Sequence, residues 1–283
     1  MSLSVHSQLG PPGYFARHRR QRLLAQMRML PGLDDYSKRA IVFSPHQDDE
    51  VLGCGGTIIK KIEEGADVHI VFMTNGRRSH AGHMEIDALI EMRRSEAINA
   101  AAILGVAEDR VTILDLPDGK LGEHKESAVA SVGALLERIR PEEVFVPSRY
   151  DGPDDHLATY QFVVDALRKT HQSPRMVEYA VWFWHYWPWV NSDERIVKST
   201  LRAFLNALMR PIRMRREFNA CVDISACRDR KLAALAAHES QVKRLMPECD
   251  WPILSDISNG AWLAACTQDI EIFSVCESDC IPR

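Results

Sequence analysis

An unusual run of acidic residues follows a short apolar segment early in the chain. Residues 40–44 (AIVFS) are apolar and largely β-branched, and they lead through His46 to three consecutive carboxylates, Asp48, Asp49 and Glu50. Carboxylates this close to the end of a buried strand repel one another and are costly to desolvate unless a positive charge compensates them. A metal ion would supply that charge. Because His46 and Asp49 are three residues apart, a helix starting here would bring both to one point, with Asp48 beside them.

A catalytic zinc site needs a third protein ligand if one position is to stay open for water. The best candidate is His156, in the acidic segment 150–156 (YDGPDDH). This segment follows a predicted strand at 143–147, so it would reach the same edge of a sheet as His46. A single histidine at a helix start is more often structural. Together with His46 and Asp49, however, His156 completes a two-histidine, one-aspartate set that fits catalytic zinc.

Strand-like and helix-like segments alternate through the first half of the chain and would position these residues. Predicted strands cover 40–44, 67–74, 111–116 and 143–147, and predicted helices cover 51–64, 84–104 and 127–140. Such alternation with short connections predicts right-handed βαβ units. The expected fold class is therefore α/β, with a Rossmann-like, mostly parallel sheet that has helices on both faces. Ligands of such sheets bind where the strands end, which is where the polar segments fall.

The second half is less regular and predicts a mixed C-terminal portion. Residues 176–190 hold four of the six tryptophans and predict one or two strands; helices are expected at 201–218 and 226–245, and a short strand at 219–224. The tryptophans would offer an aromatic platform for a sugar ring or an apolar aglycone. Side chains packing on both faces of a strand are the simpler interpretation for most of them.

Residues 1–37 are predicted to form an N-terminal extension, followed by one domain over 38–283. In the extension Leu23, Leu24, Met27 and Leu30 recur at helical spacing with arginines between them, which indicates a basic amphipathic helix. Such a helix can lie on an anionic membrane, bind a partner or dock on its own domain. Docking with a solvated basic face is the interpretation we favour.

Composition limits the classes of function. The chain has 283 residues, 46% of them hydrophobic, and a formal net charge of −4, which argues against nucleic acid as a partner. The sequence contains neither an evident secretory signal nor an apolar run of transmembrane length. Seven scattered cysteines without a CxxC pair favour reduced thiols and a cytoplasmic location.

Several motifs together resemble the LmbE-like, or PIG-L, family of zinc-dependent N-deacetylases. The family's opening motif, P/A-H-P-D-D-E, is similar to residues 45–50 (PHQDDE), with Gln47 where proline is usual. Further similar segments are Val51 to Thr57, Arg93 and Glu96 with 104–106 (LGV), 116–119 (LPDG), and 231–241 (KLAALAAHESQ). The resemblance covers roughly residues 38 to 245.

The resemblance implies a role for each candidate residue. His46, Asp49 and His156 would bind Zn²⁺, and Asp48 would be the general base that takes a proton from water activated by the metal. Arg93, Asp118 and His238 would be substrate-binding residues. The implied substrate is a small N-acetylated amino sugar, such as an N-acetylglucosamine derivative, or a glycoconjugate, from which acetate and a free amine are released. A homo-oligomer is left open.

One position departs from the family pattern. The second motif is commonly H-x-D-H, and alignment on His156 places Pro153 where the first histidine would stand. That histidine is thought to stabilise the oxyanion or protonate the leaving amine. His80, His83 or His238 would have to substitute, or Asp48 would shuttle the proton alone. Two alternatives therefore stand beside the deacetylase: a catalytically silent carbohydrate-binding relative, and an amidase for a larger glycoconjugate.

Overall fold

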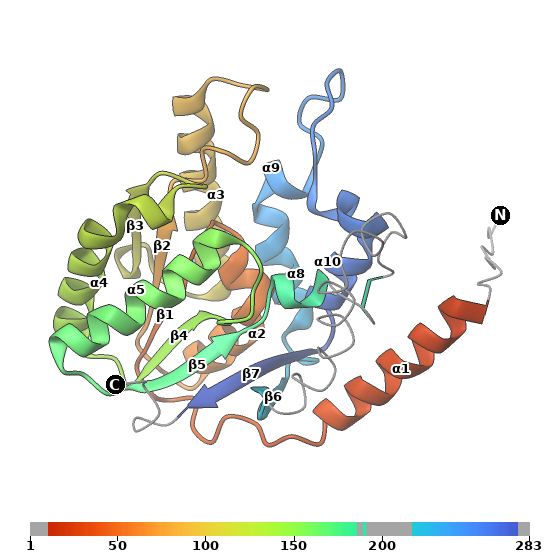
Figure 1. The fold of residues 1–283 in the computed structure, drawn as a ribbon, viewed down its shortest axis with the longest axis horizontal. Coiled ribbons are helices and arrows are strands. Elements are labelled where there is room, and N and C mark those ends of the chain that lie inside the picture. Colours follow the sequence, from red (N-terminus) through yellow and green to blue (C-terminus); the bar gives the residue numbers. More distant parts are fainter. Residues whose placement is uncertain (1–10, 186–188, 191–216, 277–283) are drawn as a thin grey trace.

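The computed structural model describes residues 11–185, 189–190 and 217–276. Its centre is a seven-stranded sheet in the order β3-β2-β1-β4-β5-β7-β6, visible edge-on in Figure 1. The strands are β1 (Ala40–Ser44), β2 (Val68–Thr74), β3 (Val111–Leu116), β4 (Glu143–Pro147), β5 (Arg175–Tyr179), β6 (Ala220–Asp223) and β7 (Ile270–Cys276). Strands β1 to β5 pair in parallel, whereas β7 is antiparallel to both β5 and β6. The predicted fold class is confirmed.

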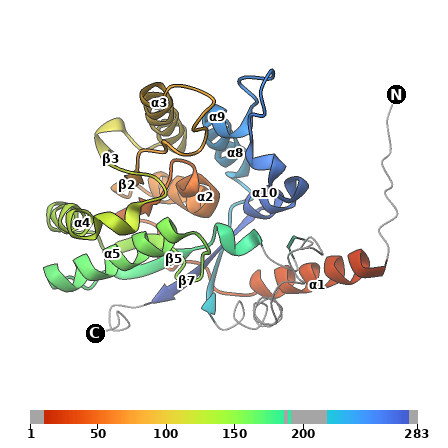
Figure 2. The same ribbon diagram turned by 45° about the horizontal axis from the view of Figure 1, so that its top comes forward.

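Helices cover both faces of the sheet (Figures 1 and 2). On one face lie α2 (Asp49–Glu63), α3 (Ile86–Leu104) and α8 (Arg228–Ala237), and on the other lie α4 (Lys125–Ile139) and α5 (Asp154–Thr170). Alternating strand residues supply the two cores. In β1, for example, Ala40 and Val42 belong to the α2 side, while Ile41 and Phe43 belong to the α4 side. Both faces of the strand are therefore buried, as its continuous apolar sequence requires.

The register of the central strands brings the predicted site segments together. Ala40 at the start of β1 pairs with Val68 of β2 and with Glu143 of β4, so the amino ends of the three parallel strands are in register. Their carboxyl ends consequently reach the same edge of the sheet. The loops that leave β1 and β4 there carry residues 45–48 and 148–153.

The C-terminal portion differs in detail from the sequence prediction. The strand predicted over 176–190 ends at Tyr179, and Trp182–His185 form a turn of 3₁₀ helix instead. The helix predicted over 226–245 is broken at His238, between α8 and the short α9 (Glu239–Val242). The strand predicted at 219–224 is present as β6, and β7 was not predicted. The helix predicted over 201–218 lies, apart from its last two residues, outside the described residues.

The N-terminal helix α1 (Pro11–Met27) runs along the β6 side of the molecule (Figure 1). Leu23 and Met27 are buried in the same core as α2, and Arg28 forms an ion pair with Asp269. This arrangement matches the docking interpretation of the helix. The division of the chain at residues 37 and 38 stays a prediction. Of the helices that the structure describes, none is both long and apolar enough to cross a membrane.

Candidate metal centre

Three predicted ligands converge at the carboxyl edge of the sheet. His46 lies in the loop after β1, Asp49 is the first residue of α2, and His156 lies in the first turn of α5. Oδ2 of Asp49 is 3.2 Å from Nδ1 of His46 and 3.2 Å from Nε2 of His156. Donor atoms bound at 2.0–2.2 Å to a tetrahedral zinc lie roughly 3.3–3.6 Å apart. The three side chains therefore have the spacing of a zinc site, and they form one of the His/Asp clusters able to hold a metal.

The hydrogen bonds of His156 support this assignment. The side chain is fully buried, its Nδ1 is 3.1 Å from Oδ2 of Asp151, and its Nε2 makes no hydrogen bond. Asp151 also accepts hydrogen bonds from the backbone N–H groups of Val181 and Phe183. A carboxylate that holds one ring nitrogen of a histidine fixes the tautomer whose other nitrogen binds metal. Nε2 of His156 is thus buried and directed at Oδ2 of Asp49, 3.2 Å away, as a nitrogen that shares a metal ion with that carboxylate would be.

His46 is held by a second group of acids. Its Nε2 lies 3.3 Å from both Oδ1 of Asp118 and Oδ2 of Asp155. The oxygens of Asp155 already accept hydrogen bonds from the backbone N–H groups of Gly119 and Leu121, and Asp118 accepts one from the N–H of Arg78. These two carboxylates are therefore better suited to orienting His46 than to forming a second metal site.

The charges of the cluster leave both histidine rings protonated when no metal is bound. Burial would lower the pKa of His46, but hydrogen bonds to Asp118, Asp155 and Asp49 outweigh burial and hold that pKa well above its ordinary value. For His156, burial is likewise outweighed by the charge of Asp49 and by Asp151, which together raise the pKa to about 9. A cluster that traps protons in this way attracts a cation in their place.

Asp48 adopts a backbone conformation that is rare for any residue except glycine. Its φ is 133°, inside the left-handed region where a Cβ atom is strained. Its N–H donates to Oε2 of Glu50 at 3.0 Å, and its Oδ2 lies 3.8 Å from Nη2 of Arg93. Burial raises the pKa of Asp48 to about 7, and the charge of Arg93 opposes the rise. The protein thus keeps a strained backbone at Asp48, a buried carboxylate next to the three predicted metal ligands.

Glu50 and His238 form the layer behind Asp48. Besides the N–H of Asp48, Glu50 accepts a hydrogen bond from the hydroxyl of Ser44, and its Oε1 lies 3.1 Å from Nε2 of His238. Glu50 and His238 are both fully buried. The sequence predicts a substrate contact for His238, whereas the structure gives it an indirect position: the break between α8 and α9 turns its ring toward Glu50.

The cluster opens into a cavity of about 220 Å³ with one polar and one apolar side. Its polar side includes Asp48 together with Arg93 and Asp118, the other two predicted substrate-binding residues. The apolar side is formed by Leu52, Trp182, Leu254 and Trp262, and the rings of Trp182 and Trp262 are stacked with their centroids 4.9 Å apart. Half-buried Trp182 therefore lines the same cavity as the polar groups.

The three histidines considered as substitutes at Pro153 do not line this cavity. His80 is buried, with Nε2 2.8 Å from the carbonyl oxygen of Pro252 and its ring stacked on Trp251 at 4.0 Å. His83 lies in the same loop, also close to Trp251. Asp48 does line the cavity, and it is not among the acids that contact His46 or His156.

Helix α2 is broken directly behind the ligands, at Cys54, whose φ of −148° is not helical. Glu271 of β7 fills the break: its carboxylate accepts hydrogen bonds from the N–H groups of Gly56 and Thr57, each at 2.8 Å, and from the Thr57 hydroxyl. Lys231 of α8 lies beside it and donates to Oε1 of Glu271 and to the carbonyl oxygen of Leu52. The pair satisfies backbone groups that the break leaves without helical partners.

Close packing requires glycine in α2. A Cβ atom on Gly53 would lie 2.2 Å from the ring of Tyr179 in β5, and one on Gly56 would lie 2.5 Å from Ile224. Neither distance is possible without movement of the neighbour. The glycine-rich sequence after the acidic run therefore serves close docking of α2 on the sheet.

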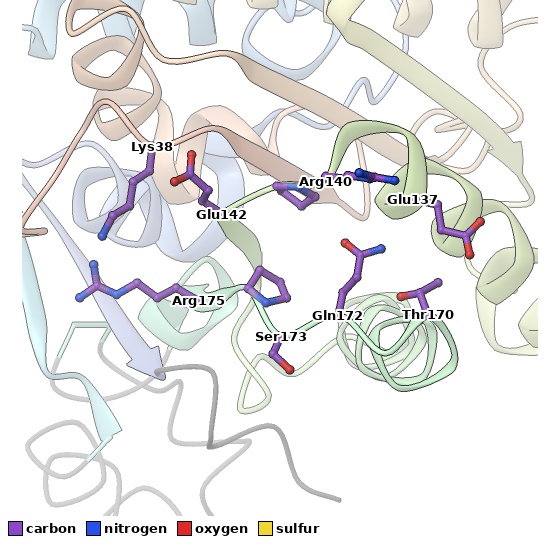
Figure 3. Close-up of a pocket in the computed structure, with 10 residues that line it drawn as sticks. Lys38, Glu137, Arg140, Glu142, Thr170, Gln172, Ser173 and Arg175 are labelled. Atoms are coloured by element: carbon purple, nitrogen blue, oxygen red, sulfur yellow. The ribbon is translucent and has the colours of Figure 1, made fainter.

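A larger hollow, of about 880 Å³, lies at the opposite edge of the sheet (Figure 3). It is lined by residues at the amino ends of β4 and β5 and by the ends of α4 and α5. Arg175 is paired there with Asp34 and Glu143, and Lys38 with Asp34. Neither histidine nor cysteine lines this hollow, and neither of the metal-binding clusters found in the described part of the chain is near it.

Residues 41–167, which include every predicted ligand, match the family model described as GlcNAc-PI de-N-acetylase. Over these residues the chain matches the PIG-L, or LmbE-like, family. A diacetylchitobiose deacetylase of Thermococcus kodakarensis is 32% identical over 123 residues, covering 42% of this chain and 45% of that protein. A 4-oxalmesaconate hydratase of Pseudomonas putida is 31% identical over 127 residues, 41% and 48% of the two chains.

Solved structures of other proteins share the fold. The N,N'-diacetylchitobiose deacetylase of Pyrococcus horikoshii superimposes with a TM-score of 0.60 over 96% of this chain and 95% of that chain, at 21% identity. The chain covers less than half of the length of the curated relatives that match first. The relatives that this chain matches include proteins named as deacetylases and one named as a hydratase.

Two departures from the PIG-L motifs have a visible structural context. Gln47, in place of the usual proline, is buried. Its side-chain Nε2 donates to the carbonyl oxygen of Thr74 at 2.8 Å, and its backbone carbonyl oxygen accepts a hydrogen bond from Nη2 of Arg93. Pro153 is the residue immediately before α5 and has an extended conformation. At the first motif the chain is therefore held to β2 and α3 by hydrogen bonds of Gln47.

Sequence reasoning missed two carboxylates of the site, Asp151 and Asp155. Both lie in the acidic segment 150–156, but Asp155 reads as an ordinary acidic residue of a first helical turn. Asp151 precedes His156 by five residues, a spacing that matches no helical face. Only the path of the loop shows that one holds His156 and the other holds His46.

Proposed function

We propose that this protein is a zinc-dependent N-deacetylase that hydrolyses the acetamide of an N-acetylated amino sugar or sugar conjugate and releases acetate and a free amine. The observation that carries the proposal is the convergence of Nδ1 of His46 and buried Nε2 of His156 on Oδ2 of Asp49, next to a cavity that Asp48 lines. The match to the family supports the same reaction class. Bound zinc would lower the pKa of a water molecule and polarise the amide carbonyl.

The residues of the chain have separate proposed tasks. Asp48, whose pKa burial raises to about 7, takes the proton from the attacking water and has the affinity to hold it until the amine leaves. Arg93 limits that rise in pKa and keeps a fraction of Asp48 ionised near neutral pH. With Pro153 in place of the auxiliary histidine, Asp48 returns the proton to the amine by itself.

The cavity favours a small reacting group. Its volume of about 220 Å³ is below the ~300–1,000 Å³ of pockets that enclose drug-sized ligands. Arg93, whose Nε and Nη1 make no hydrogen bond, can donate to the hydroxyls of a sugar, and the half-buried ring of Trp182 can pack against its apolar face. Asp118, which also contacts His46, borders the same space. These features support a single N-acetylated ring in the cavity, with any larger conjugate extending outside it.

The test is acetate release from N-acetylglucosamine derivatives by protein whose metal content has been measured, before and after zinc is restored. Acetate release that requires zinc is the expected result. Binding of the sugars without hydrolysis, across a broad panel and with zinc restored, would instead identify a silent carbohydrate-binding relative. Because one relative is named 4-oxalmesaconate hydratase, hydration of 4-oxalmesaconate is measured in parallel; activity on that substrate alone would overturn the proposal.

A further inference from the structure

Gln47 lies buried between the loop that carries His46 and the end of β2. Its side-chain Nε2 donates to the carbonyl oxygen of Thr74 at 2.8 Å, and only 1% of the residue is exposed. Thr74 in turn donates to the carbonyl oxygen of Pro45, from its N–H at 3.1 Å and from its hydroxyl at 2.9 Å. The loop is therefore fastened to β2 on both sides of His46. A proline at position 47 has no side-chain amide and could not make the contact to Thr74.

The backbone carbonyl oxygen of Gln47 is the hydrogen-bond acceptor for Arg93. Nη2 of Arg93 donates to this oxygen, and among the described residues Arg93 makes no other hydrogen bond. Its Nε and Nη1 are buried without a partner, in a residue that is 1% exposed. A guanidinium has five N–H donors, and a buried one normally uses several of them. The direction of this guanidinium therefore depends on the one carbonyl that holds Nη2.

Two acids balance the charge of Arg93 without fixing its direction. Oδ2 of Asp48 lies 3.8 Å from Nη2, and Oε2 of Glu96 lies 3.8 Å from Nη1, and both distances are longer than a hydrogen bond. The carboxylate of Glu96 is committed to Ser240, from whose N–H and hydroxyl it accepts hydrogen bonds at 2.6 and 2.7 Å. Charge compensation and orientation are thus separate here, and orientation comes from Gln47.

Close packing at Gly76 keeps the side chains of Gln47 and Arg93 next to each other. A Cβ atom on Gly76 would lie 2.5 Å from Oε1 of Gln47 and 3.1 Å from Nε of Arg93. Oε1 is a buried acceptor without a hydrogen bond, and Nε is a buried donor without one. The side-chain oxygen of Gln47 is therefore near the Nε side of the guanidinium, while the backbone oxygen of the same residue holds the Nη2 side.

We propose that Gln47 is a positioning residue for Arg93. Its side-chain amide anchors residue 47 to β2, and the backbone carbonyl that this anchor fixes orients the guanidinium toward the cavity. Arg93 lines the cavity and Gln47 does not, so Gln47 acts through Arg93. The consequence for catalysis rests on the proposed function, in which Arg93 contacts the sugar: the anchor strengthens sugar binding more than it assists the chemical step.

The first experiment does not depend on turnover. NMR spectroscopy measures hydrogen exchange at Nε of Arg93, whose signal is identified by its absence from Arg93→Met. Gln47→Met keeps the length of the side chain and removes both of its polar atoms. Gln268→Met is the matched control, because Nε2 of Gln268 also donates to a backbone carbonyl oxygen at 2.8 Å and Gln268 does not line the cavity.

Exchange at Nε of Arg93 should become about tenfold faster in Gln47→Met and stay within about twofold of wild type in Gln268→Met. The backbone amides of β1 should keep their exchange rates within about twofold in both variants. Unchanged exchange at Arg93 in Gln47→Met overturns the inference. An equal acceleration of the β1 amides also overturns it, because the effect would then be a general loss of stability.

The second experiment measures the kinetics of acetate release. Gln47→Met should raise KM by about three- to tenfold, change kcat by less than about twofold and leave the zinc content unchanged. In an Arg93→Met background the same substitution should have no further effect on KM, because the residue through which Gln47 acts is gone. A fall in kcat without a change in KM overturns the inference, and so does an effect that persists in full without Arg93. Failure of the wild-type protein to release acetate counts against the proposed function alone, since the exchange measurement still decides the role of Gln47.

Discussion

Glu271 and Lys231 meet at 2.8 Å inside the break of α2, where both side chains are buried. The carboxylate binds the N–H groups that start the second half of the helix, and the ammonium binds a carbonyl oxygen that ends the first half. The first half carries Asp49 and follows Asp48. The ion pair therefore positions the residues proposed to hold the metal and move the proton, although neither member lines the cavity.

Removing one member of this pair should destabilise the protein strongly. Lys231→Met leaves Glu271 buried without its cation, which typically costs about 3–5 kcal/mol of unfolding free energy. Lys243→Met is the control, because Lys243 forms an exposed ion pair with Glu239 and should change stability by less than about 1 kcal/mol. Denaturant unfolding of the two variants measures the difference; equal stabilities would show that the pair has no structural role.

Asp48→Asn should separate metal binding from catalysis. The amide keeps the size of the side chain but cannot accept a proton from water, so turnover should fall by roughly 10²–10⁴-fold. Zinc content should stay at the wild-type level, because the three predicted ligands are intact. Asp154→Asn is a matched control, since Asp154 is an exposed acid in the first turn of α5. Full activity of Asp48→Asn would refute the assigned general base.

Arg93 should set the acid limb of the pH profile. Burial raises the pKa of Asp48 to about 7 and Arg93 opposes the rise, so activity should increase with pH as Asp48 loses its proton. Bound zinc adds positive charge and should place the midpoint below that value. Arg93→Met should move the midpoint to higher pH by roughly one unit. Arg94→Met, at a half-exposed neighbour paired with Asp115, should leave it in place; a downward shift for Arg93→Met would contradict this account.

Zinc binding should release protons. Neighbouring carboxylates raise the pKa of His156 to about 9 and hold that of His46 well above its ordinary value, so both rings are largely protonated at pH 7 in the metal-free protein. A ring nitrogen must lose its proton to bind zinc, and apparent affinity should therefore rise with pH until about 9. Calorimetry in buffers of different ionisation enthalpy counts the protons. A zinc affinity that stays constant from roughly pH 6 to roughly pH 8 would rule out this linkage.

Asp151→Asn should weaken zinc binding although Asp151 is not a predicted ligand. The asparagine can no longer offer a charged acceptor to Nδ1 of His156, and loss of such a partner typically lowers metal affinity by about 10–100-fold. Competition with a chelating dye measures the change. Asp165→Asn provides the comparison, because Asp165 lies in α5, the helix that carries His156. The proposal fails if the Asp151 and Asp165 variants bind zinc with the same affinity.

Local sequence was sufficient where one short pattern determines an element. The continuous apolar runs of β1, β2 and β4 predict buried parallel strands, and the polar residues that follow them lie at one edge as expected. The three predicted ligands converge for the same reason. Asp48, Arg93 and Asp118 also line one cavity.

The remainder depends on contacts between distant segments. Neither glycine nor proline marks the end of α8 in the sequence. The helix ends at Ala237, and the ring of the next residue, His238, contacts Glu50. The strand predicted over 176–190 ends at Tyr179, because the following backbone turns to donate hydrogen bonds to Asp151. The place of β7 between β5 and β6 is a matter of sheet order, which local pattern does not encode.

The contact between α2 and β7 also bears on the time at which activity arises during synthesis. Glu271 lies 215 residues beyond Gly56, whose N–H it accepts. A growing chain that has emerged only as far as α5 already contains every predicted zinc ligand, yet the helix that presents Asp49 still lacks the carboxylate that closes its break. The proposed site is therefore completed late, and a prematurely terminated product would carry the acidic motif without a rigid support for it.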